Sequence, residues 1–284
     1  MSAGRLWSVT LILVACSLVG IFSRAGALHP SPSKDEVSRL DQRKEPAAPA
    51  STLEEPVRRA KRAIADCQKR FATVLDYTCT FAKRERIDGT LTSRHVMNLK
   101  ARTTPESLYF KFLNPKKGRE AIYVSGRHGG KFLAHDVGLG RLIAGTMILD
   151  PRGPTAMVDC RHPITEAGIG SLIENVAKHW SLELTPEESR VVIDPNMTIG
   201  SHRCTMIESV HAAKQPNFLF HKVRLFVDQE HGLPIRFEAY DWPKQPGGSA
   251  ELVEEYSYLD LKVNVGLTDR DFDPSNKSYS FGRF

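Results

Sequence analysis

The segment at residues 161–165, which reads RHPIT, holds the side chains of this chain that are best suited to polar chemistry. The proline keeps His162 out of helical geometry, and Thr165 is typical of a helix N-cap. Arg161 and His162 would then lie just before the positive end of a helix, where anions are favoured. The segment predicts either a site for a phosphate or carboxylate headgroup, or a loop braced by an ion pair of Arg161 with Glu120 or Asp159.

The other polar residues form no recognisable catalytic or metal-binding pattern. The 10 histidines include no H-x-x-x-H or H-E-x-x-H pair, so no metal site is predicted. The sequence also lacks a G-x-S-x-G nucleophile elbow, a C-x-x-C pair and a dinucleotide-binding glycine fingerprint. We therefore predict a non-catalytic protein without a cofactor. The enzymatic alternative is a hydrolase that uses Arg161 and His162.

The first 27 residues have the layout of a bacterial export signal. Arg5 precedes an apolar run over residues 6–22, and a small-residue cleavage site ends at Ala27. Three fates stay open: cleavage after Ala27, lipidation at Cys16, or retention as an anchor. The apolar run is near the lower limit of the about 20 residues that a membrane-spanning helix needs. The sequence predicts an exported protein, periplasmic or extracellular, with or without an N-terminal membrane anchor.

The charge balance suggests no nucleic-acid partner. The formal net charge is +6, and charged residues make up 25% of the chain. These charges are interspersed, as on a solvated surface, and the nearest approach to a basic patch is the short run at 116–119. A nucleic-acid-binding surface would need a basic stripe interleaved with aromatic residues, and we predict none here.

Cysteine usage fits an oxidising compartment. Cleavage after residue 27 would leave four cysteines, an even number that permits up to two disulfides. We expect the pairs Cys67–Cys79 and Cys160–Cys204, although four cysteines allow three connectivities. Buried free thiols are the alternative.

The chain divides into three parts. Residues 1–27 form the signal or anchor, and the proline-rich residues 28–52 form a disordered tether because they hold almost no large apolar side chain. Residues 53–284 form a single β-rich domain. It begins with a helix over residues 53–76, in which apolar residues recur at spacings of three and four.

From Tyr77 onward the apolar residues alternate with polar ones, as in β-strands. The short connections predict an antiparallel meander, because parallel strands need long crossovers. A helix capped by Thr165 and running to about Trp180 interrupts the strands, and four or five more strands follow. The predicted fold is α+β: a long N-terminal amphipathic helix packed in a curved antiparallel sheet, with an inserted helical segment.

Five short motifs occur in a fixed order along this domain. They are Y-x-C-x-F-x-K-x-E at 77–85, G-R-E at 118–120, D-P at 150–151, R-H-P-I-T at 161–165 and F-D-P-S-N at 272–276. Together they resemble a family of secreted bacterial proteins with a domain-of-unknown-function label, abundant among planctomycetes. The resemblance covers residues 53–284. That family is similar in layout to LolA/LolB-like lipoprotein carriers, whose open half-barrel holds acyl chains under helical lids.

This resemblance implies an apolar cavity inside a half-barrel. The larger side chains of one strand face are the candidates for lining it: Phe110, Phe112, Ile122, Leu225 and Phe237. Arg161 and His162 would meet a headgroup at the mouth, and a lid around residues 138–145 would admit the ligand. Complete filling of the core by the helix and these side chains is the alternative.

The function predicted from these observations is binding of a lipid, an acyl chain or a similar apolar ligand by an exported envelope protein. The expected partners are lipids, acylated proteins and the membrane surface. The alternative is a structural or protein-interaction module of the cell envelope with a filled core.

Overall fold

The computed structural model describes residues 50–137 and 145–282. The predicted export segment, Cys16 and most of the tether lie outside these described residues, as does most of the predicted lid around 138–145. No helix in the described part is both long and apolar enough to cross a membrane.

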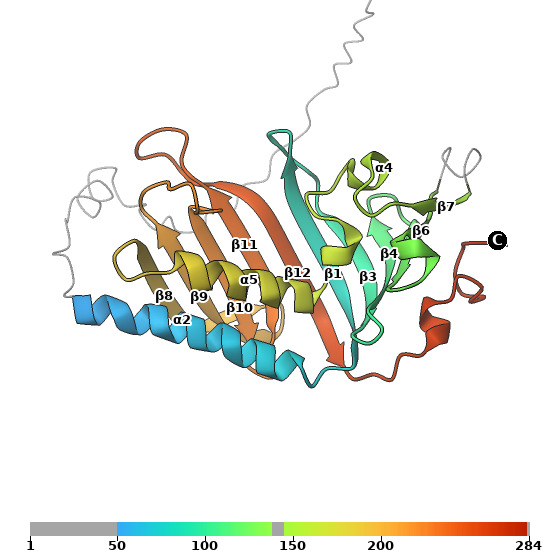
Figure 1. Cartoon of the computed structure of the whole chain (residues 1–284), viewed down its shortest axis with the longest axis horizontal. Coiled ribbons are helices and arrows are strands. Elements are labelled where there is room, and N and C mark those ends of the chain that lie inside the picture. Colours follow the sequence, from blue (N-terminus) through green and yellow to red (C-terminus); the bar gives the residue numbers. More distant parts are fainter. Residues whose placement is uncertain (1–49, 138–144, 283–284) are drawn as a thin grey trace, which may run out of the picture. The chain divides into compact units, whose positions relative to one another are not determined.

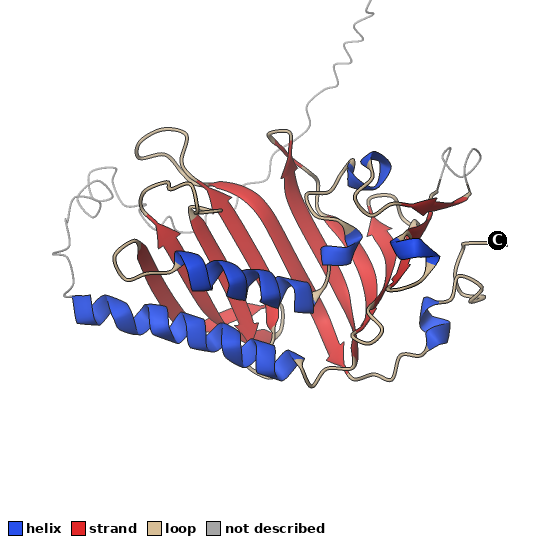
Figure 2. Ribbon diagram, in the orientation of Figure 1, coloured by secondary structure: helices blue, strands red, loops and turns tan. Residues whose placement is uncertain are grey.

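A single antiparallel sheet dominates the structure (Figures 1 and 2). Its 12 strands have the order β7-β6-β5-β4-β3-β1-β12-β11-β10-β9-β8, and β2 pairs with β1 beside this path. The strands are β1 (Asp76–Ile87), β2 (Thr90–Leu91), β3 (His95–Arg102), β4 (Ser107–Asn114), β5 (Glu120–Val124), β6 (Phe132–His135), β7 (Thr146–Leu149), β8 (Ser189–Ile199), β9 (His202–His211), β10 (Lys222–Asp228), β11 (Pro234–Asp241) and β12 (Glu251–Val263). The predicted antiparallel meander is confirmed.

The alternating sequence gives the sheet two distinct faces. Phe81 on β1 pairs with Met97 on β3 and with Tyr258 on β12, so large apolar side chains meet across neighbouring strands. Two helices, α2 (Ala50–Phe71) and α5 (Ile169–Glu183), lie in front of this side of the sheet and pack against each other (Figure 1). We call this side the helix-covered face and the opposite side the outer face.

Helix α2 buries the apolar stripe that its sequence predicts. Val57, Ala60, Ile64 and Cys67 are all buried, and the helix packs against α5 and β8. It ends at Phe71, earlier than the predicted Asp76, because Asp76 already belongs to β1. The Asp76 carboxylate accepts hydrogen bonds from the backbone N–H groups of residues 265–267. Residues 72–75 therefore form the turn between the helix and β1.

Helix α5 begins at Ile169, not at the predicted cap Thr165. Thr165 lies in the short 3-10 helix η2 (Ile164–Glu166), and Gly168 occupies the N-cap with φ of 105°. Tyr77 on β1 acts in place of a capping side chain, since its hydroxyl lies 2.9 Å from the backbone nitrogen of Ile169. The first turn of α5 is therefore fixed from the sheet below it. Two other short helices are described, α4 (Pro154–Met157) and η1 (His128–Gly130).

The C-terminal segment covers part of the outer face. After β12 the chain forms η3 (Asp269–Phe272), and Phe272 and Phe281 are buried in a second apolar cluster with Tyr109, Ile122, Val124 and Leu133. Tyr279 stacks on Tyr109 with ring centroids 4.1 Å apart. The first half of β4, the whole of β5 and most of β6 are thus buried.

Candidate functional site

A cavity of about 450 Å³ lies between the helix-covered face and α5. The sheet contributes mostly apolar side chains, and α5 contributes one side of its apolar stripe. The main apolar lining residues are Phe81, Met97, Phe110, Phe112, Phe132 and Phe237 from the sheet, with Leu172, Val176 and Trp180 from α5. Residues 155–168, before α5, close part of the remaining side. A concave apolar space with a few polar groups is the usual form of a small-molecule site.

Aromatic rings make a continuous floor under this cavity. Phe81 lies 6.0 Å from Phe110, 5.0 Å from Tyr258 and 6.1 Å from Tyr256, measured between ring centroids. Tyr256 is in turn 6.1 Å from Phe237, and the two rings are nearly parallel. Because these residues come from four different strands, the sheet itself holds the floor in position.

Charged groups line one part of the cavity in compensated pairs. Nζ of Lys83 lies 2.7 Å from a carboxylate oxygen of Glu85, and both side chains are almost fully buried. Burial alone would raise the pKa of Glu85, but Lys83 and the hydroxyl of Tyr256, 2.7 Å away, outweigh it and lower this pKa. Burial likewise opposes the charge of Lys83, yet Glu85 raises the pKa of this ammonium.

Arg161 and His162 converge on Glu254, which is almost fully buried on β12. Nε of Arg161 lies 2.9 Å, and Nε2 of His162 3.0 Å, from the same oxygen of Glu254. The hydrogen bond that Glu254 accepts from His162 raises the pKa of this histidine, and burial opposes it. The structure corrects the expected partners of Arg161: Asp159 pairs with Lys116, and Glu120 lies near Lys111. Because α5 begins at Ile169, its positive end is also farther from His162 than we expected.

A second histidine–carboxylate group lies at the end of α5. The Glu183 carboxylate is buried, 2.7 Å from Nδ1 of His179 and 3.7 Å from Nε2 of His211. Burial lowers the pKa of His211, whose Nδ1 lies 3.2 Å from the hydroxyl of Ser189. His179, Glu183 and His211 all line the cavity. Glu183 is paired with His179, so this end of the cavity is closed without an unpaired carboxylate.

Of the seven residues predicted to contact a ligand, Phe110, Phe112, Phe237 and His162 line the cavity. Ile122 does not, because it faces the opposite side and packs with the C-terminal segment. Leu225 is fully buried in the packed core between its neighbours Ile207 and Phe237. Arg161 borders a separate, shallower hollow beside Arg86 and Asp241.

Sequence reasoning missed several lining residues, and the signal for them was present. Phe81, Lys83 and Glu85 alternate along β1 and therefore share one face. Met97 faces the same way, since it pairs with Phe81. Phe132 carried a weaker signal, because the short strand β6 is nearly all buried.

The four described cysteines are free, so both predicted disulfides are wrong. Cys67 lies on α2, which packs against β8, whereas Cys79 lies on β1, five positions away from β8 in the sheet order. Cys160 lies 3.2 Å from Nζ of Lys83 on β1, while Cys204 lies on β9. Burial raises the pKa of Cys67 to about 12 and that of Cys204 to about 11. These thiols act as buried apolar groups.

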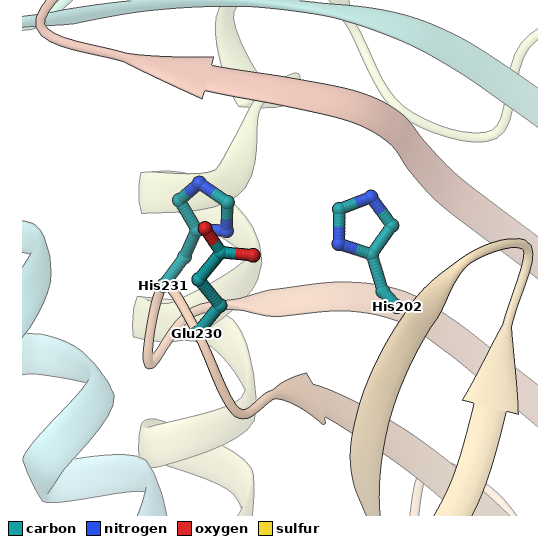
Figure 3. Close-up of side chains that lie close together, drawn as sticks. All are labelled: His202, Glu230 and His231. Atoms are coloured by element: carbon teal, nitrogen blue, oxygen red, sulfur yellow. The ribbon is translucent and has the colours of Figure 1, made fainter.

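Outside the cavity, the described residues contain one group that could hold a metal ion: His202, Glu230 and His231 (Figure 3). The histidines come from the start of β9 and from the turn between β10 and β11. No local sequence pattern joins them, which is why a search for closely spaced histidines predicted no metal site.

Comparison with known proteins gives a family and distant structural likenesses. No curated protein matches the chain. The MucA/MucB complex of Pseudomonas aeruginosa is similar at 11% identity and a TM-score of 0.45, over 76% of this chain and 60% of that one. Lipoprotein LppX of Mycobacterium tuberculosis is similar at 10% identity and a TM-score of 0.41, over 75% of this chain and 97% of that one. A LolA superfamily protein from Nitrosomonas europaea is similar at 12% identity and a TM-score of 0.31, over 75% of this chain and 97% of that one.

These likenesses are too distant for us to draw a functional conclusion from them. The family match is more extensive, since it spans residues 74–281 and so includes the whole sheet, α5 and most of the C-terminal segment. The chain belongs to DUF1571, a family of proteins of unknown function.

Proposed function

We propose that this protein binds an acyl chain or a similar apolar ligand in the cavity beneath α5, and that it acts by binding rather than by catalysis. One observation carries the proposal: a cavity of about 450 Å³ whose floor is a row of aromatic side chains. This volume falls in the usual range for small-molecule sites, about 300–1,000 Å³. In this proposal the sheet is the wall of a half-barrel and α5 is its cover.

The expected affinity follows from the burial of methylene groups. Each buried methylene contributes about 0.8 kcal/mol, so a chain of about 16 carbons gains about 13 kcal/mol. Association entropy and ligand ordering oppose this gain by about 4–15 kcal/mol. A cost near the lower part of that range leaves about 8 kcal/mol, which corresponds to micromolar binding.

The paired charges favour an acyl chain linked as an ester or amide over a free anion. Lys83 is neutralised by Glu85, and Glu254 accepts hydrogen bonds from both Arg161 and His162. An incoming anion would have to compete with these carboxylates for their cations. The Tyr256 hydroxyl donates its hydrogen to Glu85, so its oxygen can still accept a hydrogen bond from an amide N–H at the end of the chain.

The N-terminal sequence supports a role in the cell envelope, where lipids and acylated proteins supply such chains. Export, and the choice among cleavage after Ala27, lipidation at Cys16 and retention, remain predictions from sequence. In either anchored form the cavity would be held near a membrane surface, which fits extraction of a chain from that surface.

Native mass spectrometry with lipid extraction tests the proposal. The full chain, purified from a bacterial periplasm, should carry lipid of defined mass or take it up from phospholipids or acylated peptides. Ala134→Phe adds a ring inside the cavity and should lower binding at least tenfold. Ala212→Phe adds the same ring at an exposed turn and should bind as the wild type does. An apo mass that persists after incubation would contradict the proposal and favour the protein-interaction alternative.

A further inference from the structure

Three side chains with metal-binding chemistry meet where β9 begins and β10 ends. One donor atom from each of His202, Glu230 and His231 lies within 4.8 Å of the other two. Figure 3 shows His231 and Glu230 side by side on the turn, with His202 opposite and one ring nitrogen turned toward them. His202 and His231 are partly buried, and Glu230 is exposed. None of the three lines the cavity beneath α5.

The sheet topology brings these residues together. Strands β9 and β10 are antiparallel neighbours, and Cys204 near the start of β9 pairs with Asp228 at the end of β10. His202 and the 229–233 turn therefore lie at the same end of the sheet. Gly232, with φ of 66°, allows the tight return to β11. The backbone of His202 and that of the turn are therefore held close together by the pairing of β9 with β10.

Asp228 provides a buried carboxylate at the centre of this group. Its side chain is only 1% exposed, and one oxygen lies 2.5 Å from Nδ1 of His231. The other oxygen lies 3.5 Å from Nδ1 of His202. The backbone N–H of His231 also donates to Asp228. Asp228 thus orients the His231 ring by a hydrogen bond and lies close to the His202 ring, and a carboxylate beside metal-binding histidines is a common arrangement.

We propose that His202, His231 and Glu230, supported by Asp228, form a site for a divalent transition-metal ion of the zinc class. Two imidazoles favour zinc and its neighbours over magnesium and calcium, which prefer oxygen donors alone. Two nitrogens with carboxylate oxygens match the four-coordinate donor sets that zinc takes in proteins. The site would be structural, since it lies apart from the cavity.

The donor atoms all lie within 4.8 Å of one another, close to the spacing of a filled site. Donor atoms around a tetrahedral zinc ion, bound at about 2.0–2.2 Å, lie roughly 3.4 Å from one another. Glu230 is exposed and can turn inward, so the donors can close without moving the strands. A bound ion would tie the start of β9 to the β10–β11 turn. It would also stabilise the end of α2, because Nε of Arg70 lies 2.9 Å from the backbone oxygen of His231.

Zinc titration of the untagged full chain tests this proposal. After treatment with chelator, the protein should bind one equivalent of Zn²⁺ by isothermal titration calorimetry, and Zn²⁺ should raise its Tm while Mg²⁺ does not. His202→Ala and His231→Ala should each weaken binding at least 100-fold. Asp228→Asn should weaken it 10- to 100-fold, as expected for a residue that orients the ligands.

The controls separate loss of the site from loss of the fold. His128→Asn changes an exposed histidine in η1 and should leave zinc affinity and the zinc-dependent rise in Tm unchanged. Circular dichroism without metal should show that each variant is folded, and Glu230→Gln, at an exposed position, provides a variant with little risk of misfolding. The proposal is overturned if the wild type binds no zinc, or binds it no more tightly than the folded Glu230→Gln and His202→Ala variants.

Discussion

The region of β8–β10 and the region of β4–β6 bury their side chains in different ways. In the first, Ile207 and Leu225 are fully buried in close packing, and α2 packs against β8. In the second, Phe110 and Phe112 border the cavity on the helix-covered face, while the C-terminal segment packs on the outer face. A sheet that leaves space on one face needs apolar burial elsewhere.

The helices and the C-terminal segment have different roles: the helices cover the face that holds the cavity, and the C-terminal segment packs on the opposite face. Helix α5 roofs the cavity, and α2 packs beside it on the same face (Figure 1). The segment after β12 supplies the packing that β4–β6 would otherwise lack, through Phe272 and Phe281. Stability and ligand binding should therefore respond to different substitutions.

The largest expected effect is that of Phe272→Ala. This ring is 1% exposed and lies 5.0 Å from the guanidinium carbon of Arg102, so its loss leaves a void in the outer cluster. Replacement of a buried Phe by Ala costs about 3–5 kcal/mol. Urea unfolding should show this loss as a lower midpoint. Leu182→Ala on the exposed side of α5 is the control, and a Phe272→Ala midpoint equal to the control's would mean that the segment does not contribute to the core.

Leu225→Ala tests the close packing of the β8–β10 region directly. Leu225 is fully buried, and we expect a loss of about 2–5 kcal/mol in the free energy of unfolding. Acyl-chain binding should not change, because Leu225 does not border the cavity. Phe112→Ala should show the reverse, with a smaller loss of stability and altered binding, since its ring already faces open space. Equal effects of the two variants on binding would contradict the distinction between the regions.

The sequence predicted the alternating strands well, and it failed where a strand is buried on both faces. Phe110, Phe112 and Phe237 follow the two-residue period and do line the cavity. Every residue of β5 is buried, so apolar character could not show that Ile122 faces the C-terminal segment. Contacts between residues that are far apart in the sequence likewise leave no local sequence pattern.

The polar site depends on pairs that only the folded topology defines. Arg161 and Glu254 are far apart in sequence, and β12 reaches the 161–165 segment only because it pairs with β1. The same limit applies to His202 and His231, which antiparallel pairing of β9 and β10 brings together. The N-cap of α5 was missed because the cap is a tyrosine hydroxyl from another element.

Gly168→Ala should have a moderate effect, since it disturbs the contact between α5 and the sheet. Gly168 has a φ of 105°, and an added Cβ would lie 2.7 Å from the hydroxyl of Tyr77. We expect a loss of about 1–3 kcal/mol from backbone strain and the displaced hydrogen bond. Gly89→Ala is the matched control, because Gly89 also has a positive φ but an added Cβ there meets nothing within 4 Å. If the two variants lose equal stability, the contact with Tyr77 contributes nothing.

The smallest expected effect is a pH dependence at the polar edge of the cavity. The carboxylate of Glu254 raises the pKa of His162, so folding favours the protonated ring. This stabilisation is fully present below the unfolded pKa of histidine, about 6.5, and is lost as the pH rises through the higher folded pKa. His162 is partly exposed, so solvent weakens the interaction.

The stability difference between the wild type and His162→Gln should therefore be larger at pH 6 than at pH 9. Urea unfolding at the two pH values measures this difference, and His128→Gln at an exposed position should show no such change. A difference that grew toward pH 9 would mean that folding favours the neutral ring, contrary to the contact with Glu254. Because His162 also lines the cavity, the same pair of pH values shows whether bound ligand depends on its charge. Binding that stays constant while stability changes would place the ligand on the aromatic floor, away from this histidine.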